Sequence, residues 1–155
     1  MNDLDERILD DYLAGIDRKL DAAAGADWSS LSDAERATIT GYLFALEITN
    51  GGIEQFLVNP SGDRWRETLQ AIRTVGASRL GDLFEQALAI FPDNAPSVDQ
   101  VTRCSQLAAA GETARELLWR LTGQYYDLQA ASSEHCLYQK LTAFAKAQMA
   151  TENPK

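Results

Sequence analysis

The 155-residue sequence predicts an all-α fold, in which about seven or eight helices form a single compact multi-helix domain. Apolar residues recur at helical spacing along most of the chain, and no alternating strand pattern is longer than four residues. Capping boxes and glycine breaks divide this pattern into separate helices. The length favours one domain with one core, which we place at residues 1–150, and residues 151–155 are expected to fray.

The first half of the chain predicts three helices. The first is expected from Asp3 to about Ala23, because its apolar residues recur every three or four positions. A capping box at residues 32–35 begins the second helix, which runs to about Thr49 and is predicted to be the central element, since its second half is apolar nearly all round. A glycine pair ends it as a left-handed C-terminal cap, and a short helix follows over residues 53–58.

The second half of the chain continues the pattern. After a turn at residues 59–62, helices are expected over residues 63–75, 77–91, 98–110 and 112–121. Gly111 either separates the last two of these or bends one longer helix. Ser97 is expected to cap the helix at residues 98–110, and Ser133 a last helix that ends near Ala150. Residues 122–127 fit neither a helix nor a loop clearly.

The negative charge is concentrated near the N-terminus. The net charge is −9, and residues 1–35 contain ten acids and three bases, which gives this segment a net charge of −7. Direct nucleic-acid binding is disfavoured, because it usually requires a basic surface. A basic protein surface, such as that of a DNA-binding regulator, is the more natural partner.

Five of these acids are predicted to form an acidic ridge on one side of the first helix. At 100° per residue they cluster opposite the apolar stripe, over a length of about 27 Å. They are Asp3, Glu6, Asp10, Asp17 and Asp21. Two interpretations are open: the ridge keeps the protein soluble, as charged helix faces commonly do, or it is an interaction surface.

The sequence offers little for metal or thiol chemistry. Cys104 and Cys136 are expected to be free thiols, and His135 is the only histidine. The paired spacings of a zinc site are absent, and neighbouring residues of a helix point about 100° apart, which disfavours a Cys–His pair. We assign no catalytic residue, cofactor or metal.

No run of 18 apolar residues and no signal core occurs, so we expect a cytoplasmic protein with no membrane partner.

A motif at residues 47–59 combines a carboxylate, a glycine pair and two amides inside an apolar stretch. Its residues are Glu47, Asn50, Gly51, Gly52, Gln55, Phe56 and Asn59. Because a buried carboxylate requires a partner, we interpret the motif as a structural joint, in which Glu47 and the amides lock two helices together. The alternative is a small-molecule or hydrolytic site, in which Glu47, Asn50, Gln55 and Asn59 line a pocket and Glu47 is a general base.

The order Glu47-x-x-Asn50-Gly51-Gly52-x-x-Gln55-Phe56-x-x-Asn59, followed by Gly62 and Gly76-Ala77, resembles a bacterial all-helical family catalogued largely as a domain of unknown function. That family includes an acidic dimeric DNA-mimic protein, which occupies the DNA-binding face of a transcriptional regulator. The resemblance is good from about Glu35 to Phe91 and departs at Leu57, where a second aromatic residue is expected. It implies an all-helical fold and a non-enzymatic interaction with a basic partner.

The ridge alone is a sparse copy of DNA, since its carboxylates recur every ~6 to 10 Å and the phosphates of one strand every ~3.4 Å. Acids of a second subunit in a homodimer, or of other helices, would have to fill the gaps. A basic middle region is expected either to pair with nearby acids or to meet the first helix of another subunit: Arg64, Arg66, Arg73 and Arg79. Three tryptophans are expected in the core or at its edge: Trp28, Trp65 and Trp119.

Overall fold

The computed structural model describes residues 3–22, 28–131 and 136–152, and the regular structure in these ranges is entirely helical, which confirms the all-α prediction. Their elements are α1 (Asp3–Ala22), η1 (Trp28–Ser30), α2 (Asp33–Val58), η2 (Pro60–Arg64), α3 (Trp65–Thr74), α4 (Ser78–Leu88), η3 (Pro92–Asn94), α5 (Gln100–Ala131) and α6 (Leu137–Glu152). Over the described ranges, six α-helices replace the predicted seven or eight. Two of them are broken by glycines, α2 at Gly51 and Gly52 and α5 at Gly111.

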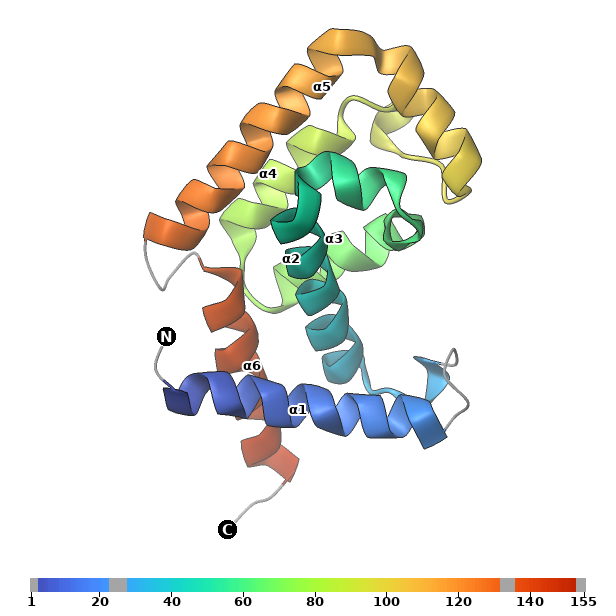
Figure 1. Ribbon diagram of the computed structural model, residues 1–155. Helices are drawn as coiled ribbons and strands as arrows, with labels where there is room; N and C mark the ends of the chain where they lie inside the picture. The colour runs from blue at the N-terminus through green and yellow to red at the C-terminus, as the bar shows by residue number, and fades with distance from the viewer. Residues whose placement is uncertain (1–2, 23–27, 132–135, 153–155) are drawn as a thin grey trace.

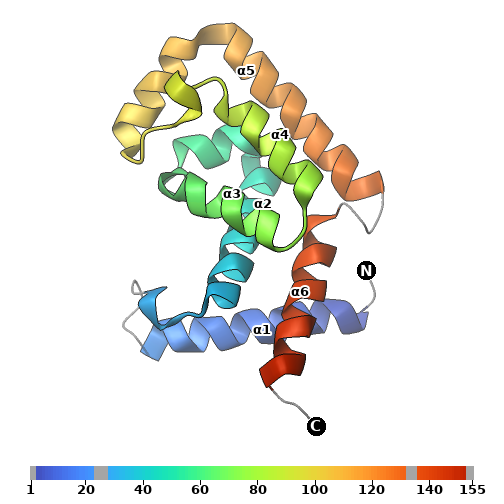
Figure 2. The same ribbon diagram turned by 180° about the vertical axis from the view of Figure 1, so that it is seen from behind.

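Helix α2 is the central element of the fold. It packs against α1, α3, α5 and α6. Figure 1 shows α1 running past the first turns of α2 and crossing α6 partway along its length, while α5 arches over the opposite end of the molecule. From behind, α3 and α4 cover α2 between these two ends (Figure 2). The apolar second half of α2 is therefore only partly covered by other helices: Phe44, Ala45 and Ile48 are buried, as the sequence predicts, whereas Leu43 (39%) and Leu46 (36%) are exposed.

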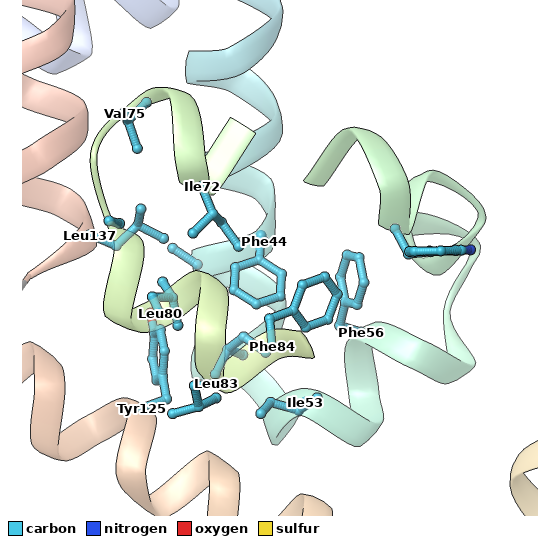
Figure 3. Packing of buried hydrophobic residues seen from close by; sticks show 14 of the residues in the cluster. Phe44, Ile53, Phe56, Ile72, Val75, Leu80, Leu83, Phe84, Tyr125 and Leu137 are labelled. Atoms are coloured by element: carbon cyan, nitrogen blue, oxygen red, sulfur yellow. The ribbon is translucent and has the colours of Figure 1, made fainter. Parts of the chain in front are cut away.

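Three phenylalanines form the centre of the core (Figure 3). The ring centroid of Phe44 lies 5.1 Å from that of Phe56 and 5.0 Å from that of Phe84, and Phe56 and Phe84 are 5.6 Å apart. Tilted and edge-to-face contacts of this kind each contribute about 0.5–1.5 kcal/mol beyond burial. Phe44 and Phe56 lie on opposite sides of the glycine pair, so their contact fixes the angle between the two segments of α2.

The N-terminal cap of α5 lies two residues after Ser97, the residue predicted from the sequence, so that prediction is wrong. The helix begins at Gln100, and its cap is Asp99, whose Oδ1 accepts a hydrogen bond from the backbone N–H of Thr102 (2.8 Å). Ser97 instead holds the turn before the helix, since its Oγ accepts a hydrogen bond from the N–H of Asp99 (3.1 Å). Its carbonyl accepts another from the Arg103 side chain (2.7 Å).

The last part of the chain is more helical than expected. Residues 122–127, which were ambiguous in sequence, continue α5 to Ala131, and Gly111 bends this helix without ending it. Helix α6 runs to Glu152, and the rest of the expected tail lies outside the described residues, as does the predicted cap Ser133.

A buried arginine joins the end of α2 to the start of α5. Arg103 is fully buried, and its Nε donates a hydrogen bond to the carbonyl of Leu57 (2.6 Å). Its Nη1 donates to the carbonyl of Ser97 (2.7 Å), and its Nη2 to the carbonyl of Asn59 and to the carboxylate of Asp63 (both 2.8 Å). Buried charges persist in proteins when they are paired in this way. Nothing in the sequence pattern distinguishes Arg103 from a surface arginine.

We predict that Arg103→Gln lowers the free energy of unfolding by about 3 kcal/mol or more, because several backbone carbonyls would lose their donor in a buried place. Arg79→Gln is the control: Arg79 is exposed, and its change is expected to stay within about 0.5 kcal/mol. Urea unfolding followed by circular dichroism measures both. Equal, small effects would show that the guanidinium is not needed to hold α2 and α5 together.

Candidate functional site

The described part of the acidic ridge lies on the outer face of α1. Asp10, Asp17 and Asp21 are exposed. Asp3 and Glu6 lie in the first two turns of the helix, and their side chains lie outside the described part of the chain. The residues that attach α1 to the core are buried: Leu9, Tyr12, Leu13 and Ile16. The helix is thus divided into an apolar face toward the core and an acidic face toward solvent.

A buried carboxylate fixes the position of α1 against α2. Glu35 is 5% exposed and accepts a hydrogen bond from Lys19 Nζ on α1 (2.6 Å). Its second oxygen accepts from the N–H of Ser32 (2.9 Å), which completes the predicted capping box. Burial raises the pKa of the Glu35 carboxyl, but the hydrogen bonds from Lys19 and Ser32 outweigh burial, so the pKa lies below its ordinary value. The contact also pairs one positive charge of α1 with a carboxylate of α2.

The carboxylate of the motif is held by two donors. Glu47 Oε2 accepts a hydrogen bond from Asn59 Nδ2 (2.8 Å), and Oε1 accepts one from Ser61 Oγ (2.7 Å). These contacts cross the glycine pair and tie the first segment of α2 to the turn that follows its second segment. Asn59 was predicted as an amide donor, whereas Ser61 was not singled out in the sequence.

The glycine pair allows a close contact between α2 and α5. Gly52 has φ 78° and ψ −173°, a conformation that is essentially restricted to glycine and differs from the left-handed cap expected from the sequence. A Cβ at this position would lie 2.8 Å from Thr122 Oγ1. The Thr122 hydroxyl accepts a hydrogen bond from the N–H of Ile53 (3.0 Å), the first residue after the break. Gln55 lies against Gly51, where a Cβ would meet its side chain at 2.8 Å.

A hollow of about 270 Å³ lies beside the glycine pair, between α2 and α5. Of the four residues in the predicted alternative site, only Asn50 lines it. Glu47, Gln55 and Asn59 do not. The walls are formed by both α2 and α5, and Trp119 and Tyr126 belong to the α5 side. The arrangement therefore places the carboxylate and the hollow in different places and does not form the pocket that the alternative requires.

The described residues provide no cluster of metal ligands, and both cysteines are free thiols. No group of three or more His, Cys, Asp or Glu in the described ranges could hold a metal ion. Cys104 and Cys136 are free and half-buried, and Cys104 Sγ contacts the carbonyl of Val58 (3.7 Å). His135 lies outside the described residues.

Of the helices described, none is both long and apolar enough to cross a membrane.

Two of the four arginines of the basic middle region, Arg64 and Arg73, form ion pairs within the chain. Arg73 forms ion pairs with Asp82 (2.7 Å) and Glu85 (3.1 Å), and Arg64 pairs with Glu67 (3.0 Å). These contacts favour local pairing over a contact with the first helix of another subunit.

The tryptophans differ in their environment. Trp65 is buried, and its Nε1 donates a hydrogen bond to the carbonyl of Pro96 (2.9 Å). Trp28 is half-buried beneath the Arg64 guanidinium, 3.6 Å from the ring centroid. Trp119 is 82% exposed, so its expected place in the core or at its edge is wrong. It lines the hollow between α5 and α2, and periodicity alone did not reveal its exposure.

A family model described as DMP19-like protein matches residues 29–148. The chain belongs to the DMP19-like protein family. This membership confirms the family predicted from the motif at residues 47–59, which lies inside the matched range. Helix α1 lies before that range, and residues 1–28, with eight acids and three bases, carry a net charge of −5. No curated protein and no solved structure matches the chain significantly.

Two alanine substitutions separate backbone strain from packing at the glycine pair. Gly111 has nearly the same conformation as Gly52 (φ 79°, ψ −169°), but a Cβ there would meet nothing within 4 Å. We predict that Gly111→Ala costs about 1–3 kcal/mol of stability from strain. Gly52→Ala is expected to cost about 1–3 kcal/mol more, because the new methyl group would displace Thr122. Chemical unfolding of both variants measures the difference, and equal costs would contradict the packing role of Gly52.

The Glu35 contact predicts a pH-dependent stability. A folded-state pKa below the ordinary value means that the ionised side chain stabilises the fold above pH 4.5, and this contribution is lost as the pH falls through the folded-state pKa. Glu35→Gln is therefore expected to lower the free energy of unfolding by about 1–3 kcal/mol at neutral pH, and by progressively less below pH 4.5. Urea unfolding across this range measures it, with the exposed Glu67→Gln as control. A pH-independent difference would contradict the role of the charged form.

Proposed function

We propose that this protein is a non-enzymatic acidic interaction protein, a DNA mimic that binds a basic DNA-binding or regulatory protein. The observation that carries the proposal is the outer face of α1, on which Asp10, Asp17 and Asp21 are exposed and opposed by an apolar face packed on the core. A rigid helix that presents carboxylates to solvent attracts a basic surface over a distance of about a Debye length.

Family membership supports the proposal through the fold. The motif resembles a family that includes a DNA-mimic protein, and the family match covers the scaffold that holds α1. Because the matched range begins at residue 29, the ridge itself is supported by the chain's own charge distribution. A shared fold can host several functions, so the charged surface has to be tested directly.

The alternative is a small-molecule-binding or hydrolytic site around Glu47, Asn50, Gln55 and Asn59. The geometry favours the structural joint over this site. Both carboxylate oxygens of Glu47 accept hydrogen bonds from side chains of the turn after α2. A general base must have a free lone pair in reach of a substrate proton. The hollow beside the joint is lined by Asn50 but not by this carboxylate.

We also propose a homodimer, since a second copy would supply further carboxylates beside a sparse ridge. The exposed aromatic residues of α5 suit a subunit contact: Trp119 is 82% exposed and Tyr126 45%. Tryptophan and tyrosine are enriched at the centres of protein interfaces. Sedimentation velocity of the wild type and of Trp119→Asp measures the mass in solution. A dimer that Trp119→Asp dissociates is expected, and a monomeric wild type would contradict this part of the proposal.

The ridge is tested by a five-fold neutralised variant and a matched control. The ridge variant carries Asp3→Asn, Glu6→Gln, Asp10→Asn, Asp17→Asn and Asp21→Asn. The control neutralises five acids outside α1 and has the same net charge: Glu54, Asp93, Glu112, Glu116 and Asp127. Binding to a panel of purified basic DNA-binding regulators is measured by biolayer interferometry between about 50 and 200 mM salt.

We expect at least one regulator to bind the wild type, to be displaced by double-stranded DNA, and to dissociate steeply as salt is raised. The ridge variant is expected to bind at least about tenfold more weakly, because each removed charge contributes a small screened interaction. The control variant is expected to keep most of the affinity. Equal losses in the two variants, or binding that salt and DNA leave unchanged, would contradict the ridge as the mimic surface.

A further inference from the structure

A hollow lined by several helices lies away from both the ridge and the glycine pair. It measures about 710 Å³ and is enclosed by η1, α2, the end of η2, α3 and α6. This volume falls within the usual range for small-molecule sites. We name it the α2–α3 groove. Neither the motif at residues 47–59 nor the acidic residues of α1 line it.

The floor of the groove is apolar and made of short side chains. Ala34 and Ala37 of α2 and Ala71 of α3 leave the space between the two helices open, and Phe144 of α6 closes one end. Ala37 and Ala71 are themselves almost fully covered by their neighbours. An apolar body therefore fits the floor better than a strongly hydrated one.

The side chain of Thr40 adds a hydroxyl group to the groove. Thr40 is 6% exposed and lines the hollow. Its neighbour Thr38 donates a hydrogen bond to the carbonyl of Ala34 one turn back (2.9 Å), as helical threonines often do. A threonine hydroxyl both donates and accepts hydrogen bonds, so Thr40 offers a polar contact to a bound molecule.

A prearranged guanidinium forms one wall of the groove. Arg64 stacks on the Trp28 ring at 3.6 Å, and its Nε pairs with Glu67 (3.0 Å). Among the described residues, its two Nη atoms have no hydrogen-bond partner. A planar guanidinium held in this way offers paired N–H groups to a carboxylate.

The charges of the lining limit how negative a ligand can be. Arg36 is paired with Asp33 (2.8 Å), as Arg64 is with Glu67, so each cation already has a neighbouring carboxylate. The lining thus carries two charges of each sign. A single carboxylate can share the Arg64 guanidinium, whereas a phosphate or another polyanion would be repelled by Asp33 and Glu67.

We propose that the α2–α3 groove is a binding site for a small monocarboxylic acid with an apolar, flat body. The carboxylate binds the free edge of Arg64, the body lies on the alanine floor beside Trp28, and a polar substituent reaches Thr40. This site is independent of the proposed partner of α1, so either proposal stands without the other.

The probe for this site is 1-naphthylacetate, titrated into the full-length protein and followed by ¹H–¹⁵N correlation spectra. Three tryptophan indole signals serve as reporters: Trp28 in the groove, Trp65 in the core and Trp119 on the exposed face of α5. We expect saturable shifts of Trp28 and of backbone amides in the first two turns of α2 and in α3. Shifts centred on Trp119, or no saturable shift at millimolar probe, would overturn the proposal.

The chemistry of recognition is tested by variants and by a neutral probe. Arg64→Gln is expected to weaken binding at least about tenfold, and the neutral amide 1-naphthylacetamide to bind the wild type about tenfold more weakly than the acid. Arg66→Gln is the matched control, because Arg66 also stacks on a tryptophan ring, at 4.2 Å from that of Trp65, but does not line the groove.

Ala37→Leu fills the floor and is expected to abolish binding while the rest of the spectrum keeps its wild-type dispersion. If Ala37→Leu does not fold, Thr40→Val tests the same site with a nearly isosteric side chain and is expected to change the preference among hydroxylated naphthoic acids. Equal affinity of Arg64→Gln and Arg66→Gln, or of the acid and the amide, would overturn the proposed mode of binding.

Discussion

The guanidinium of Arg103 is the contact on which the arrangement around the motif depends. It is fully buried and donates hydrogen bonds to carbonyls at the end of α2 and to Asp63 in η2. This fixes the turn that carries Asn59 and Ser61, whose side chains donate to Glu47. The carboxylate of the motif is therefore satisfied only while a residue 56 positions further along the chain holds the turn in place. Burying this charge with all its partners costs less free energy than leaving the same carbonyls without a donor, which is what removal of the guanidinium would do.

The glycine pair has a complementary role in the same joint. Its positive φ at Gly52 turns the second segment of α2 so that Phe56 meets Phe44 across the break, and it lets Thr122 of α5 approach the backbone. Strain at a glycine costs little, whereas any side chain there would have to displace α5. The joint, the aromatic core and the α5 contact thus stabilise one another.

The acidic face of α1, the motif at residues 47–59 and the α2–α3 groove lie on separate parts of this molecule. Asp10, Asp17 and Asp21 of α1 face solvent, and the ion pair between the half-exposed Lys19 and the buried Glu35 attaches that helix to α2. The motif is partly buried, and its carboxylate accepts hydrogen bonds from Asn59 and from Ser61 in the turn after α2. The α2–α3 groove lies on a third part of the surface, with its own cation and aromatic ring. The fold therefore places the exposed acids of α1, the motif and the groove on separate parts of the molecule.

The sequence by itself determined the features that depend on neighbouring residues. Helical periodicity predicted the all-α fold and the two faces of α1, the capping box placed the start of α2, and the glycine pair placed its break. Each rests on contacts within about four residues, so the pattern is visible in the chain. The motif was enough to predict the family, and a partner for Glu47 followed from the cost of burying a carboxylate.

Only the tertiary structure decided which side chains meet across long separations. Arg103 looked like any surface arginine, and its burial depends on carbonyls of α2 and η2 more than 40 residues away. The choice of Asp99 over Ser97 as the cap of α5 follows from the same contact, and the exposure of Trp119 follows from how α5 packs on α2 and α4. Such outcomes depend on how helices dock on one another, and docking is set by the shape of the whole core and not by local spacing.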